Sequence, residues 1–152
     1  RQPKDNVNDL KRELKISENQ LTIEQSSRSK DFWSNLLRKV DLVIKPSRTE
    51  GFGMSGLRAI TADLPVLVSR NCGLGRVLQS LSSGAQHVID SEDPKVWANA
   101  IKAVRAKAVQ VRREESEQLR KDYMQRFNCK EQWDEIVKEM FSMNAHKSGE
   151  YK

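Results

Sequence analysis

Apolar side chains change their spacing along the chain in a way that predicts alternating helices and strands. Between residues 30 and 40 the apolar positions are Phe32, Trp33, Leu36, Leu37 and Val40. This three- and four-residue spacing predicts a helix packed on a sheet. The run 41–45 is mostly apolar and stops at Pro46, which is typical of a strand buried on both faces. We expect that strand to be central.

The alternation continues beyond this strand. A helix is predicted over 54–62, after a glycine-rich turn, and a second buried strand over 65–69. A helical turn at 77–81, a short strand at 86–89 and a long helix entered through a capped segment at 90–94 follow. Such alternation with short connections predicts an α/β, Rossmann-like domain with a parallel sheet of about four or more strands flanked by helices.

The N-terminal part is expected to add small elements to this domain. Residues 1–8 are interpreted as a disordered leader. Leu10 and Leu14 stand four residues apart, which predicts a short helix. The β-rich run 21–24 predicts a strand that ends in a turn.

The C-terminal part is expected to be helical. The mixed-charge run 112–121 is typical of a solvated helix face. Apolar residues between 133 and 141 predict a final amphipathic helix, and 144–152 a flexible tail. The domain itself is therefore expected to extend over residues 9–143.

Composition favours one soluble domain with an anionic partner. The 152 residues suit a single domain, and the net charge is +6, from 27 Lys and Arg against 21 Asp and Glu. The basic residues are scattered without interleaved aromatics, so nucleic acid is not the expected ligand. No apolar stretch is long enough for a membrane span.

Cysteine and histidine usage predicts no metal site. Cys72 and Cys129 lack a C-x-x-C spacing and a nearby histidine pair, so neither zinc binding nor a disulfide framework is expected. This cysteine usage predicts a reducing, cytoplasmic setting. His87 and His146 have no carboxylate at a catalytic spacing, and His87 is interpreted as structural. The tryptophans lie on apolar faces and are assigned to the core.

A glycine-rich turn is the strongest candidate for a binding site. Residues 51–56 read Gly-Phe-Gly-Met-Ser-Gly and match G-x-G-x-x-G between a buried strand and a helix. Backbone N–H groups at such a helix start face a phosphate, and ligands of parallel sheets bind beyond the carboxyl ends of the strands. Lys45 and Arg48 at the same strand end add positive charge. An ordinary tight turn is the alternative.

A nicotinamide dinucleotide fits this turn less well. Residues 47–50 stand between the strand and the first glycine, which usually follows its strand at once in dinucleotide-binding folds. The next strand ends at Ser69-Arg70 rather than in an acidic residue for a ribose hydroxyl. No hydrolase elbow of the form G-x-S-x-G is present either.

A longer string around the turn resembles a known family. It reads DLVIKPSRTEGFGM from Asp41 and AITADLPVLVS from Ala59. The string is similar to the donor-binding core of retaining GT-B glycosyltransferases of family four, which carry P-S-x-x-E-G-F-G, a second glutamate eight residues after the first, and a later G-x-P-V before a strand. The looser resemblance extends from about Leu10 to Phe141. It implies the C-terminal, Rossmann-like half of a GT-B fold.

The resemblance also implies roles for single residues. Glu50 matches the first glutamate, which lies near the donor sugar, and is the one tentative catalytic candidate. Residues 51–55 would present backbone N–H groups to the diphosphate. Together with the strand-end cations and position 58, the donor-binding candidates are Lys45, Arg48, Glu50, Gly51, Phe52, Gly53, Met54, Ser55 and Arg58.

Two positions depart from the family pattern by reversing charge. Arg58 stands where relatives carry the second glutamate, whose carboxylate accepts hydrogen bonds from the ribose, and a guanidinium has no acceptor. The later G-G-x-x-E pattern appears at 72–76 with Arg76 in place of the acid. If both arginines face the cleft, the site favours phosphate over the usual sugar-nucleotide geometry. The alternative is that both are surface residues.

The expected function is binding of a nucleoside diphosphate or its sugar conjugate, with no further cofactor. The acceptor domain and the first strand and helix of the GT-B C-terminal half are not recognisable in the chain, so hexosyl transfer would need a further N-terminal Rossmann-like domain as partner. We therefore expect the isolated chain to be inactive. The alternative is a degenerate, non-enzymatic phosphate-ligand sensor or interaction module of a multidomain protein.

Overall fold

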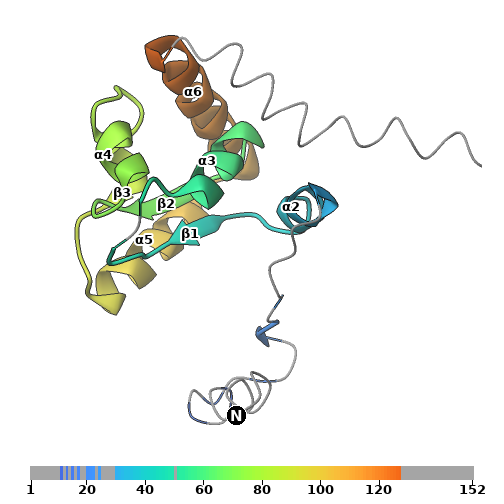
Figure 1. Ribbon diagram of the computed structural model, residues 1–152. Helices are drawn as coiled ribbons and strands as arrows, with labels where there is room; N and C mark the ends of the chain where they lie inside the picture. The colour runs from blue at the N-terminus through green and yellow to red at the C-terminus, as the bar shows by residue number, and fades with distance from the viewer. Residues whose placement is uncertain are drawn as a thin grey trace, which may run out of the picture.

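A computed structural model (Figure 1) describes residues 30–49 and 51–127, with isolated positions nearer the N-terminus. Those isolated positions are 11, 13, 15, 17, 20–22 and 24. The elements in chain order are α2 (Lys30–Leu37), β1 (Val43–Lys45), α3 (Met54–Thr61), β2 (Val66–Ser69), α4 (Gly73–Gln79), the 3-10 helix η2 (Ala85–His87), β3 (Val88–Ile89), α5 (Pro94–Ala106) and α6 (Val109–Phe127).

The three strands of the described part form one parallel sheet. Their order is β1-β2-β3, with Val43 opposite Val66 and Val68 opposite Val88. Figure 1 shows α3, α4 and α6 above the sheet and α5 below it. The predicted α/β, Rossmann-like architecture with a parallel sheet is therefore confirmed.

The strand predicted to be central is an edge strand in the described part of the chain. β1 pairs with β2 alone, and every residue of β2 is buried. Val43 packs against the core cluster. Ile44 points to the opposite face because successive strand residues alternate, and 44% of its surface is exposed. The expectation of burial on both faces was wrong for β1, and β2 is the strand to which it applies.

The main core lies between the sheet and the helices above it. Its fully buried members include Ile60 of α3, Val68 of β2, Leu74 of α4 and Leu119 of α6. Gly56 makes this packing possible, because a Cβ atom there would lie 2.8 Å from Cδ2 of Leu74.

The mixed-charge run 112–121 is not a wholly solvated face, which corrects that expectation. Ser116 and Leu119 are buried in it. Arg120 Nε lies 2.6 Å from a carboxylate oxygen of Asp63, which follows α3. α6 therefore packs along α3 with one buried face and one ion pair that fixes its position.

Other element boundaries differ from the predictions. α4 begins at Gly73 rather than at 77, because the sulfur of Cys72 caps it and accepts a hydrogen bond from the Gly75 N–H at 3.3 Å. The strand predicted at 86–89 is reduced to β3, with η2 in front of it. The described positions within 21–24 carry no strand. Residues 1–8 and the predictions for 133–141 and 144–152 lie outside the described residues.

Candidate functional site

The candidate site begins where β1 ends. Residues 46–49 leave the carboxyl end of the strand, and Gly51 to Gly53 lead into α3. Gly53 is the N-cap of α3 with φ +97°, a left-handed conformation that residues with a Cβ rarely adopt. Glu50, the tentative catalytic candidate, lies outside the described residues, so its role stays a prediction.

The turn is joined to the start of α4 by backbone hydrogen bonds. The N–H of Gly73 donates to the carbonyl of Gly51 at 2.8 Å, and the N–H of Leu74 donates to the carbonyl of Phe52 at 2.7 Å. The third amide of α4, that of Gly75, donates to the sulfur of Cys72. A Cβ at position 73 would lie 3.0 Å from the Gly51 carbonyl oxygen. The first amides of α4 are therefore satisfied within the protein.

The start of α3 is different. No side chain caps it, and in the part of the chain that the structure describes no acceptor contacts the amides of Met54 and Ser55. The Gly53 carbonyl accepts from the amides of Gly56 and Leu57, which lie further along the helix. Met54 is 44% exposed, so solvent reaches this end of the helix. The unsatisfied amides and the helix dipole favour an anion there.

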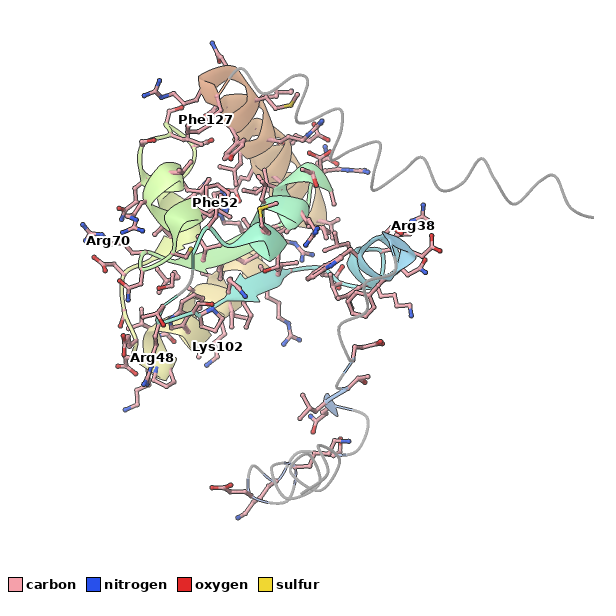
Figure 2. The ribbon with its side chains drawn as sticks, viewed as in Figure 1. Arg38, Arg48, Phe52, Arg70, Lys102 and Phe127 are labelled. Atoms are coloured by element: carbon pink, nitrogen blue, oxygen red, sulfur yellow. The ribbon has the colours of Figure 1, made fainter. Side chains whose placement is uncertain are left out.

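Of the two cations at the strand end, Arg48 lies apart from the first turn of α3 (Figure 2). Lys45 is the last residue of β1 and is half-buried. Arg48 Nε lies 3.4 Å from a carboxylate oxygen of Glu92, and both side chains are exposed. Figure 2 shows Arg48 near the first turn of α5, while Phe52 lies beside α3 and α4. An exposed pair of this kind is weak, so it leaves Arg48 able to exchange Glu92 for a ligand.

The charge-reversed arginines have different surroundings. The guanidinium carbon of Arg58 lies 4.8 Å from the ring centroid of Trp33 in α2. Arg58 is half-buried and has no carboxylate partner among the described residues. Arg76 is exposed on α4. Sequence reasoning assigned Trp33 to the core and missed this contact, which joins positions 25 residues apart.

A hollow of about 350 Å³ lies next to the turn. It adjoins the carboxyl ends of the three strands and the first turns of α5, and sequence reasoning did not find it. Its lining consists of Pro46, Ser47, Arg48, Ser69, Ser91, Glu92, Pro94, Trp97, Ala98 and Ile101. The Trp97 Nε1–H donates to the Ser91 carbonyl at 2.8 Å and so fixes one wall. The lining surface is mostly apolar, and Arg48 and Glu92 are its charged members.

Two classes of site find no support in the described residues. No group of three or more His, Cys, Asp or Glu side chains in that part of the chain is arranged to hold a metal ion. None of its helices is both long enough and apolar enough to cross a bilayer.

His87 is buried and ends η2, so it does not lie in the predicted strand. Its Nδ1 lies 3.1 Å from the Val66 carbonyl oxygen, whereas its Nε2 is buried without a partner among the described residues. Burial lowers the pKa of His87 below 6.5, with the Val66 hydrogen bond and Glu115 opposing and Lys107 adding to the effect. The folded state therefore favours the neutral ring.

This burial predicts a loss of stability in mild acid. Below pH 6.5 the unfolded chain takes up a proton on His87 that the folded chain resists, so the free energy of unfolding should fall as the pH drops toward the lowered pKa. One proton accounts for a slope of at most about 1.4 kcal/mol per pH unit. Urea unfolding of the wild type and His87→Gln between pH 8 and 5 measures it. Equal slopes for both proteins would contradict the assignment.

Comparisons with known proteins identify the family of the chain. A family described as family 4 glycosyltransferase in conflict systems matches residues 2–140. The D-inositol 3-phosphate glycosyltransferase of Corynebacterium urealyticum is 33% identical over 67 residues, which cover 44% of this chain and 15% of that protein. The enzymes of the same name from Corynebacterium jeikeium and Salinispora arenicola are each 36% identical, over 64 residues (42% and 15%) and 66 residues (43% and 14%). The matching segment is thus a small part of these relatives. No solved structure gives a significant match.

Proposed function

The chain belongs to the family 4 glycosyltransferases in conflict systems, and from this premise we propose that it binds a nucleoside diphosphate or its sugar conjugate at the β1–α3 turn. The diphosphate lies against the first turn of α3. Gly51 to Ser55 approach it through their backbone, Lys45 adds positive charge at the end of β1, and Arg48 adds positive charge to the hollow beside α5 that it lines. Glu50 contacts the donor sugar.

This proposal rests on a difference between α3 and α4 in whether their first backbone amides have hydrogen-bond partners. At α4 the first three amides already have partners, in the turn carbonyls and in the Cys72 sulfur. At α3 the amides of Met54 and Ser55 have none among the described residues, and Met54 is exposed. A phosphate gains most where donors are unsatisfied and aligned with the helix dipole. These two amides therefore form the natural anchor for a diphosphate.

The adjacent hollow suits the uncharged part of the ligand. Its volume of about 350 Å³ falls in the range of small-molecule pockets, and its mostly apolar lining includes three serine residues. A nucleobase or a sugar has the same mixture of apolar faces and polar edges. We place one of these rings there, with the phosphates extending toward α3.

Sugar transfer itself needs more protein than this chain. The curated relatives are named as glycosyltransferases, and the matching segment covers only 15% of the Corynebacterium urealyticum protein. Retaining GT-B transfer takes place between two Rossmann-like domains. We propose that the chain supplies the donor half of such a site, that the isolated chain is inactive, and that hexosyl transfer requires a second domain.

Calorimetric titration tests the binding step. The 152-residue chain is titrated with ADP, UDP and GDP and with one glucose conjugate of each. Saturable binding of at least one of them, in a one-to-one ratio, is the expected result. If none of the six ligands binds at millimolar concentration, the proposed function is wrong.

A non-enzymatic module is the second candidate, and Arg58 favours it. The arginine occupies the position at which the family motif has its second glutamate, and no carboxylate accompanies it in the described residues. A sugar-transfer assay on the chain joined to a GT-B acceptor domain separates the two candidates. Turnover would support the enzyme, and nucleotide binding without turnover would support the module.

A further inference from the structure

Arg58 is held in place by an aromatic ring rather than by an acid. Its guanidinium carbon lies 4.8 Å from the centroid of Trp33. Trp33 is itself oriented by Phe32, whose ring lies edge-on to it with centroids 5.7 Å apart. Stacking occupies the face of the guanidinium and leaves the N–H donors at its edge available. The result is an oriented cation whose hydrogen-bonding capacity is unused among the described residues.

The position of Arg58 relates it to the open start of α3. Arg58 follows Met54 by four residues, so the two lie on one face of the helix, about 6 Å apart along its axis. The exposed Met54 marks the amides that have no partner. The backbone of Arg58 thus lies one helical turn beyond those amides, and we infer that a phosphate on the amides and a second anionic group beside Arg58 belong to one nucleotide.

We propose that Arg58, oriented by Trp33, binds a phosphate group additional to those held by the turn, so that the site selects nucleotides with an extra terminal phosphate group. This inference rests on the proposed function of the turn. The extra phosphate comes either from the ribose or from a longer phosphate chain, and both present the same dianionic oxygen fork to the guanidinium. Planar arginine donors bind such oxygens in pairs.

Matched ligand pairs test the proposal on the full 152-residue chain. Adenosine 3′,5′-bisphosphate is compared with AMP for a ribose phosphate, and ATP with ADP and tripolyphosphate with pyrophosphate for a longer chain. In at least one pair we expect the wild type to bind the more phosphorylated member about tenfold more tightly, the effect of one good charge-assisted contact. Arg58→Gln should reduce this preference to about twofold or less, because the amide has no charge.

Trp33 and a distant cation provide the controls. Trp33→Leu should lower the preference while ADP affinity stays unchanged, since Trp33 positions Arg58 without contacting ligand. Lys102→Glu reverses a charge on α5, which Figure 2 shows below the sheet on the side away from α3, and should leave the preference intact. Thermal unfolding confirms that each variant is folded, and Arg58→Met replaces Arg58→Gln if it is not.

The possible outcomes distinguish a failure of this inference from a failure of the proposed nucleotide binding. If no nucleotide or phosphate compound binds the wild type, both are wrong. If ADP binds but no extra phosphate improves affinity, the turn is a nucleotide site and the role of Arg58 is refuted. If Lys102→Glu abolishes the preference as fully as Arg58→Gln does, the effect is the protein's overall charge and the subsite does not exist.

Discussion

Met54→Glu is expected to weaken binding of a nucleoside diphosphate by about tenfold or more while the protein becomes no less stable. Met54 is the first residue of α3 and is exposed, so a glutamate fits there without disturbing the core. A carboxylate in the first turn interacts favourably with the helix dipole, by about 0.3–1 kcal/mol. The same charge repels a diphosphate that occupies the adjacent amides. Affinity and stability should therefore change in opposite directions.

Met54→Gln is the matched control, because it has the same size as glutamate and no charge. Its affinity for the diphosphate should remain within about threefold of the wild type, because the backbone amides are unchanged. Calorimetric titration gives the affinities and thermal unfolding the stabilities. An unchanged affinity for Met54→Glu would place the diphosphate elsewhere.

Gly75→Ala is expected to destabilise the fold by at least about 3 kcal/mol, near the upper end for overpacking in a core. A Cβ at this position would lie 2.2 Å from the Ser69 carbonyl oxygen and 3.0 Å from Cα of Arg70. Both are backbone atoms at the end of the central strand, so no side-chain rotation relieves the clash. α4 would have to move away from β2, and the amides of Gly73 and Leu74 would leave the turn. Nucleotide affinity should fall with stability.

Gly51→Ala is the corresponding control. A Cβ at position 51 meets nothing within 4 Å, and the glycine has no positive φ. Urea unfolding should show a change within about 1 kcal/mol, as for an alanine that fits the existing backbone. A loss for Gly75→Ala no larger than that for Gly51→Ala would mean that β2 and α4 are packed less tightly than the structure indicates.

Local patterns in the sequence were sufficient to predict the elements that are determined by residues close together in the chain. The four buried residues of β2 and the apolar stripe of α3 appear directly in the sequence. The predicted capped entry to α5 is present, because Asp93 accepts a hydrogen bond from the Lys95 N–H and Pro94 occupies the first turn. These features depend on residues within one turn of each other, and that is the range over which periodicity and capping rules operate.

The features that failed depend on residues far apart in the chain. Nothing near Ile44 indicates that β1 has one uncovered face, because that depends on which strand pairs with it. The position of α6 depends in part on an ion pair between Arg120 and Asp63. A linear pattern contains no information about such pairings. The early start of α4 is a different case, because its cap at Cys72 is local but cysteine is not among the usual capping residues.

The same distinction between local and distant residues applies to the features of the candidate site. The glycine turn and its place between β1 and α3 follow from the motif. The bonds from α4 to the turn, the hollow beside α5 and the stacking of Arg58 on Trp33 do not, since each joins segments about 20 residues or more apart. The roles of Glu50 and of the other donor-binding candidates stay predictions that the titrations address.

The two main-chain bonds between α4 and the turn have a consequence for how this family can diverge. They use only the carbonyls of Gly51 and Phe52 and the amides of Gly73 and Leu74, so the anchor is shaped without any functional side chain. Side chains around the turn, charged ones included, can therefore be substituted without loss of these two bonds. Under the proposed function, single mutations around the turn could exchange one phosphorylated ligand for another without loss of the fold.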